Sequence, residues 1–339
     1  MPQATIIPSL REDQVRLLDA AEEALLAPVR GEDRRRRLPK EYFRKKPARF
    51  AGKFLFALGL TAAGWVVIGL SPHWTVIALA VLVLGLMYAH LVELQHECLH
   101  EHAFRSRRLN RLCGFICGIF LLSSFWHYKY DHLRHHAFLG TPENREFFNY
   151  RFRRLDSRAG FAVATLHPGR YVDVFRTMIR CCFGRPIPDV TRERDRKKIT
   201  AEYRLLAALL VAAVAGTAVT GSLLVPLAWF LPSLVVGEAA HFLIEMPEHF
   251  GLNTQTDPNV LANTRSINAS RLAQWYTNYN NLHTAHHYHQ GVPMAQASGL
   301  HALIAGRIEA VENSYWSFYR KVIRGDIRYQ NAAETCMTR

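Results

Sequence analysis

The chain has 339 residues, of which 49% are hydrophobic, and its formal net charge at pH 7 is +14. Its basic residues are not interleaved with aromatic residues in a known nucleic-acid-binding motif, so we expect no nucleic-acid partner. Its six cysteines form no C-x-x-C pair and predict no disulfide framework. Long apolar runs instead alternate with basic segments, as in membrane proteins whose Lys- and Arg-rich loops face the cytoplasm.

The N-terminal part predicts a tail followed by a membrane hairpin. Residues 1–49 are polar, include the run Arg34–Arg37 and show no signal peptide, so we expect a cytoplasmic tail. Apolar residues then fill 54–70 and 74–91, on either side of the turn signal Ser71–His73. Each run approaches the roughly 20 residues with which a helix crosses a bilayer.

The middle of the chain predicts a polar insertion and a second pair of spans. Gln95–Tyr203 contains the basic clusters Arg105–Arg111 and Arg134–Arg158 and most of Arg192–Arg204, and it is expected to lie in the cytoplasm. Its apolar stretch Leu112–Trp126 is too short to cross a bilayer, which predicts an interfacial or buried position. Two further spans are predicted at 205–221 and 226–244, with a kink at Pro232.

Four spans put both termini on one side of the membrane, together with all the basic loops. The predicted fold is therefore an all-α integral membrane protein with four transmembrane helices and a cytoplasmic helical cap. Residues 50–304 would form the membrane domain, and 305–339 a cytoplasmic C-terminal helix and tail. Helical periodicity extends over Leu300–Ile323, and no internal repeat is present.

Eight of the 17 histidines occur in three short motifs, one H-x-x-x-H and two H-x-x-H-H. On helices, these spacings place the imidazoles of each motif on one face. Imidazole binds iron, zinc, copper and nickel, and one structural zinc needs only four ligands. The motifs therefore predict two metal ions, held by His96, His100, His132, His135, His136, His283, His286 and His287.

Two other features are interpreted as structural. We expect the isolated histidines not to bind metal: His73, His127, His167 and His301. The stretch His167–Arg170 matches half of a haem-binding signature but has no second half, so no fused electron-carrier domain is expected.

The first histidine motif also spells H-E-x-x-H, the motif of zinc proteases. A zinc intramembrane protease would leave the two H-x-x-H-H motifs unexplained, and no H-x-x-G-x-x-H extension follows. We therefore expect Glu97 to orient a ligand histidine. A metal transporter is also disfavoured, because the motifs lie outside the apolar runs and not at the bilayer midplane.

Over Phe54–Ile304 the sequence resembles the membrane fatty acid desaturase and hydroxylase superfamily. The three histidine motifs and the spacing of the hairpins carry this resemblance. Further stretches resemble a bacterial branch: Gln95–His100 with Ala103–Phe104, Thr264–Ile267, Asn280–His283 and Val292–Pro293. The resemblance implies two non-haem iron ions, molecular oxygen, and electrons from a separate ferredoxin or reductase. It also implies a bacterial inner-membrane protein with a cytoplasmic active site.

The family pattern includes one more ligand histidine between the second and third motifs. His249 matches it within Glu248–Gly251, and His241 is the alternative. Glu238 and Glu245 flank His241, where they would orient it or bind metal.

The resemblance favours a desaturase that introduces a C=C bond into an acyl chain or similar aliphatic substrate. Two departures from the acyl-lipid pattern keep alternatives open: Glu97 replaces an aspartate, and Ala285 replaces a glutamate. The alternatives are a hydroxylase of the same superfamily and a desaturase of a small amino-acid-derived metabolite, similar to the enzyme that acts on dihydrorhizobitoxine.

Overall fold

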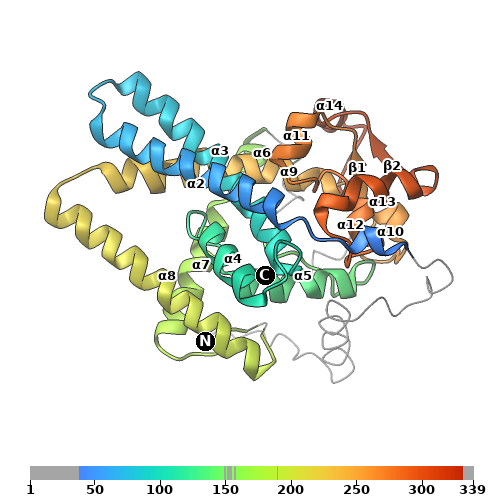
Figure 1. The fold of residues 1–339 in the computed structure, drawn as a ribbon, viewed down its shortest axis with the longest axis horizontal. Helices are drawn as coiled ribbons and strands as arrows, with labels where there is room; N and C mark the ends of the chain where they lie inside the picture. The colour runs from blue at the N-terminus through green and yellow to red at the C-terminus, as the bar shows by residue number, and fades with distance from the viewer. Residues whose placement is uncertain (1–37, 149, 151–154, 156–157, 189, 331–339) are drawn as a thin grey trace.

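The described part of the protein is mostly helical with almost no strand, as predicted. The computed structural model describes residues 38–148, 150, 155, 158–188 and 190–330 (Figure 1). Most of the predicted N-terminal tail and the end of the C-terminal tail lie outside these residues. Within them, the only sheet is a parallel pair of three-residue strands, β1 (Arg265–Ile267) and β2 (Ala310–Glu312).

In the part of the chain that the structure describes, four helical segments are long and apolar enough to cross a membrane, and they overlap the four predicted spans. They are α2 (Pro47–Leu70), α3 (Trp74–Leu99), α8 (Glu193–Thr220), and a last segment that runs from η4 (Pro226–Phe230) through η5 (Pro232–Gly237) to α9 (Glu238–His249). Large apolar side chains on them are exposed, such as Leu55, Val211 and Val219. Lipid contact explains this exposure, so the chain is an integral membrane protein.

The last span contains π-helical turns where a kink at Pro232 was expected. Residues 226–230 and 232–237 are π-helical, and each of these stretches begins at a proline. Proline has no backbone N–H to donate to the preceding turn, and the wider π-helical turn accommodates this loss within a continuous helix.

Shorter helices build the part of the molecule that holds the site. Four of them begin at a serine whose side chain accepts a hydrogen bond from a backbone N–H of the first turn: Ser106, Ser124, Ser270 and Ser314. The elements are η2 (Lys40–Phe43), α4 (Arg107–Gly118), α5 (Phe125–Phe138), α6 (Arg158–Leu166), α7 (Pro168–Cys182), α10 (Val260–Asn263), α11 (Arg271–Tyr276), α12 (His283–Tyr288), η6 (Met294–Gln296), α13 (Ala297–Ile304), η7 (Ala305–Arg307) and α14 (Tyr315–Arg324).

The first two membrane helices and the C-terminal elements lie in distinct parts of the molecule. In Figure 1, α2 and α3 run together to the upper left, while α10–α14 and both strands gather on the right. The apolar stretch Leu112–Trp126 covers the second half of α4, the turn after it and the start of α5, and Leu121 and Leu122 in that turn are buried. Where periodicity predicted one helix over Leu300–Ile323, α13 and α14 are separated by β2.

Candidate metal centre

Four separate elements carry the histidines of the predicted site. His96 lies in the last turn of α3, and His100 directly follows that helix. The second motif lies within α5 and the third begins α12, so each places its imidazoles on a helical face. His249 is the last residue of α9.

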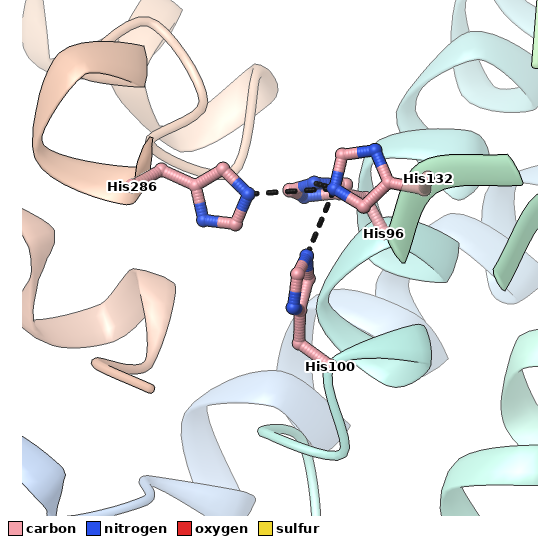
Figure 2. Close-up of side chains that lie close together, drawn as sticks. All are labelled: His96, His100, His132 and His286. Atoms are coloured by element: carbon pink, nitrogen blue, oxygen red, sulfur yellow. Dashed lines mark hydrogen bonds between the residues drawn. The ribbon is translucent and has the colours of Figure 1, made fainter. Parts of the chain in front are cut away.

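A first histidine group forms where α3, α5 and α12 meet (Figure 2). The Nε2 atom of His132 lies 2.9 Å from the Nε2 atoms of both His96 and His100, and 3.5 Å from that of His286. All four side chains are buried. We include His136 as a fifth member of this group, because its Nε2 atom lies 3.0 Å from that of His132 and 2.9 Å from that of His286.

A second histidine group consists of His135, His249, His283 and His287. Their Nε2 atoms also face one another. The distance is 3.0 Å between His249 and His283, 2.9 Å between His283 and His287, and 3.2 Å between His287 and His135. The two groups together contain all nine histidines that the sequence singles out as metal ligands.

The spacing of the nitrogen atoms fits two metal ions. Two nitrogens bound to one ion at about 2.1 Å lie roughly 3 to 3.5 Å apart. Metal binding also needs neutral imidazole. Burial, reinforced by neighbouring histidines, lowers the imidazole pKa well below its usual range in His100, His132, His136, His283, His286 and His287.

Hydrogen bonds to the outer ring nitrogens hold three imidazoles of the second group. The Nδ1 atom of His135 lies 2.8 Å from Asn144 Oδ1. The Nδ1 atom of His249 lies 3.0 Å from the backbone oxygen of Asn263, and that of His283 lies 3.2 Å from Asn280 Oδ1. An oxygen acceptor at Nδ1 places the proton there and leaves the Nε2 lone pair free for a metal.

Sequence reasoning missed one carboxylate at this centre. Glu146 Oε1 lies 2.8 Å from His135 Nε2 and 3.8 Å from His249 Nε2. Burial raises the pKa of Glu146, but the neighbouring His135 outweighs burial, so the pKa is lowered. Glu146 lies in the loop after α5, so it has no helical spacing to the histidine motifs. The one signal in the sequence that could have indicated it is an acidic residue within a basic segment.

His241 lies outside both histidine groups. Its Nδ1 atom is 2.7 Å from the Tyr150 hydroxyl and 3.2 Å from Glu245 Oε2, and its Nε2 atom is 3.8 Å from Glu93 Oε1. Glu238, the other carboxylate expected near His241, instead accepts two hydrogen bonds of 3.0 Å from Nε of Arg170. The geometry therefore places His249, and not His241, among the candidate ligands.

The environment of Glu97 differs from the expected contact with a ligand histidine. Its Oε2 atom accepts a hydrogen bond of 2.7 Å from Asn278 Nδ2, and Asn278 Oδ1 accepts one of 2.8 Å from Lys53. Glu97 thus connects α3 to the segment before α12 and to α2.

The isolated histidines lie outside both groups. His127 contacts the Tyr203 hydroxyl at 2.8 Å, and His167 Nδ1 lies 3.4 Å from Glu238. Two residues of the half haem signature, His167 and Arg170, thus contact the same buried carboxylate, which gives this stretch a structural role.

Comparison with known proteins agrees with this geometry. A sequence model of the family described as "Fatty acid desaturase" matches residues 72–319, more than half of the chain. The matched range includes all nine histidines of the two groups. A search of curated proteins gave no match.

Proposed function

Because this chain belongs to the fatty acid desaturase family, we propose that it is an oxygen-dependent di-iron desaturase that introduces a C=C bond into an acyl chain. Family membership makes it a membrane oxidoreductase of the desaturase and hydroxylase type. The observation that carries the metal assignment is the convergence of nine imidazole nitrogens into two groups.

The protein's own residues would hold the ions and exclude water. When bound, two iron ions would supply the activation of molecular oxygen needed to remove hydrogen from an unactivated C–H bond. Buried neutral imidazoles present Nε2 lone pairs without first losing a proton. Asn144, Asn280 and the backbone oxygen of Asn263 orient three of the rings through Nδ1.

The position of the site supports a lipid-soluble substrate. His96 lies in the last turn of one apolar helix and His249 is the last residue of another, so the candidate metal centre adjoins the ends of two membrane spans. An acyl chain can approach such a site from the bilayer. We place the site on the cytoplasmic side of a bacterial inner membrane, where a separate ferredoxin or reductase would supply electrons. The net charge of +14 would steer an acidic carrier to it.

One observation favours a second candidate substrate, a small amino-acid-derived molecule. Glu93 is 3% exposed, and its Oε2 atom has no hydrogen-bond partner among the described residues. A buried carboxylate without a full set of partners suits a cationic group such as an ammonium.

Metal analysis of the purified protein is the first test. We expect about two iron ions per chain, and a large loss of iron in His96→Ala, His135→Ala and His286→Ala, because each removes one ligand. His301→Ala is the matched control, since His301 lies outside both groups. Stoichiometric zinc with little iron, in protein produced with ample iron, would contradict the proposal and favour the protease.

The reaction is tested by expression with a ferredoxin and its reductase, followed by mass analysis of lipids and small metabolites. Desaturation predicts a product lighter by two hydrogen atoms that requires oxygen and disappears with His286→Ala. A product heavier by one oxygen atom, labelled from heavy oxygen gas, would identify a hydroxylase instead.

A further inference from the structure

We propose that Glu146 is a direct oxygen ligand of the ion held by the second histidine group. This inference rests on the proposed di-iron function and adds an asymmetry to it. One ion would have a carboxylate oxygen beside four imidazole nitrogens, while the other would be bound by imidazole nitrogens alone.

The first argument is the side of the imidazole that Glu146 occupies. Carboxylates that only orient a metal-binding histidine accept a hydrogen bond from its outer ring nitrogen. In His135 that nitrogen is Nδ1, and Asn144 already contacts it at 2.8 Å. Glu146 Oε1 instead lies 2.8 Å from Nε2, the nitrogen that faces the other members of the group.

The second argument is that Glu146 approaches two ligand nitrogens with one oxygen. Oε1 is 2.8 Å from Nε2 of His135 and 3.8 Å from Nε2 of His249. Ligand atoms of one ion adjoin one another in this way. The Glu146 side chain is 23% exposed, so it lies at the open edge of a group whose histidines are more buried.

The third argument is the difference between the groups. The first histidine group offers five Nε2 atoms, and no carboxylate of the described residues lies within ion-pair distance of them. The second offers four, together with Glu146. Neutral imidazoles offset none of the charge of a divalent ion, and a buried charge is costly unless it is compensated. A carboxylate ligand supplies this compensation, and mixed histidine and carboxylate ligation is common for non-haem iron.

Glu248 is the other carboxylate near the second group. Its Oε2 atom lies 3.3 Å from His283 Nε2, its one contact with a ligand nitrogen, and its Oε1 atom accepts a hydrogen bond of 2.5 Å from Asn280. Asn280 Oδ1 lies 3.2 Å from His283 Nδ1, so Glu248 helps to position this ring through Asn280 as well as approaching its Nε2 atom. Glu248 is therefore the comparison that a test must include.

Infrared difference spectroscopy tests the ligand directly. The spectrum of iron-loaded minus metal-free protein, with ¹³C-labelled glutamate for assignment, should show the stretching bands of a metal-bound carboxylate. We expect these bands in the wild type and in Glu143→Gln, a control in the same loop, and their loss in Glu146→Gln. Bands that persist in Glu146→Gln, or that are lost only in Glu248→Gln, would overturn the assignment.

A cysteine substitution gives a second, independent measurement. Cobalt(II)-loaded Glu146→Cys should gain a thiolate-to-cobalt charge-transfer band that cobalt-loaded Glu143→Cys lacks, because this band requires direct coordination. Cobalt binding without the band would overturn the proposal. If Glu146→Cys does not fold, the infrared comparison decides.

The two experiments also separate this inference from the proposed function. A wild-type protein that binds two ions without a glutamate band contradicts only the role of Glu146. A wild-type protein that binds no ion contradicts both. Glu146→Gln should weaken the binding of one cobalt ion by at least about 10-fold and leave the other unchanged.

Discussion

At the scale of single residues, the two histidine groups differ in what fixes their rings. Hydrogen bonds at Nδ1 hold His135, His249 and His283 of the second group. In the first group, the Nδ1 atoms of His96, His100 and His286 have no hydrogen-bond partner among the described residues. Ring-to-ring packing orients these side chains instead. We expect the second ion to have the more rigid ligand set.

The choice between His249 and His241 gives a prediction at this scale. His249→Ala should lose about one of the two ions, because four imidazoles are near the minimum for a stable site. His241→Ala should retain both ions, since His241 contacts Tyr150 and Glu245 outside the groups. Metal content measured on both purified variants checks this, and the opposite pattern would make His241 the ligand.

A second residue-level prediction concerns the buried ion pair between Arg170 and Glu238. Arg170 is 5% exposed and Glu238 fully buried, with 2.7 Å between Nη2 and Oε2. Arg170→Met leaves an uncompensated buried charge and should lower the free energy of unfolding by about 3 to 5 kcal/mol. Arg176→Met, which breaks an exposed pair with Asp173, should cost less than about 1 kcal/mol.

Thermal unfolding in detergent measures both effects. The double variant Arg170→Met with Glu238→Gln should recover part of the loss, because the charge that lacks a partner is then removed. Equal unfolding temperatures for Arg170→Met and Arg176→Met would show that the buried pair contributes nothing.

At the scale of elements, α3 both spans the membrane and carries the first histidine motif, so its packing affects the site. Gly85 of α3 lies directly against η5. A Cβ atom at this position would meet the side chain of Val236 and lie 2.8 Å from the carbonyl oxygen of Pro232. This contact sets the distance between two spans, one of which carries His96 in its last turn while the other ends at His249.

Gly85→Ala should therefore destabilise the protein by about 1 to 3 kcal/mol, because the added methyl overpacks a backbone contact. Gly59→Ala is the matched control within α2, since a Cβ there has open space around it. The control should be neutral or slightly stabilising, because alanine favours a helix over glycine. Thermal unfolding of both variants checks the difference, and equal stabilities would show that the two spans can separate without cost.

At the scale of the whole molecule, apolar surface and positive charge divide the chain into membrane and aqueous parts. The apolar helix α8 is exposed over much of its length, with Val219 87% exposed. In water this surface would be unfavourable, and in lipid it is not. The basic segments flank the apolar runs, and the charge rule predicts that they face the cytoplasm.

This arrangement predicts the topology. Reporter fusions that end at Arg158, at Arg196 and at the C-terminus should all report the cytoplasm, because four spans return the chain to the side on which it began. An external signal from any of the three would exclude the four-span topology.

The sequence alone determined the helical class, the four spans and the eight histidines of the motifs, because these features are local. A span is a run of about 20 apolar residues, and an i, i+3, i+4 spacing puts side chains on one helical face wherever the helix lies.

Only the tertiary structure decided how the histidines divide between the two groups. His135 and His136 are neighbours in the chain but belong to different groups, as do His286 and His287. Adjacent residues of a helix point about 100° apart, so neighbours in sequence join different histidine groups once three helices converge.

The loop position of Glu146, the contact of Glu97 with Asn278 and the place of His249 within the second group depend on contacts between distant segments. Spacing along the chain carries no information about such contacts, because a loop has no fixed period and packing alone brings its side chains to the site.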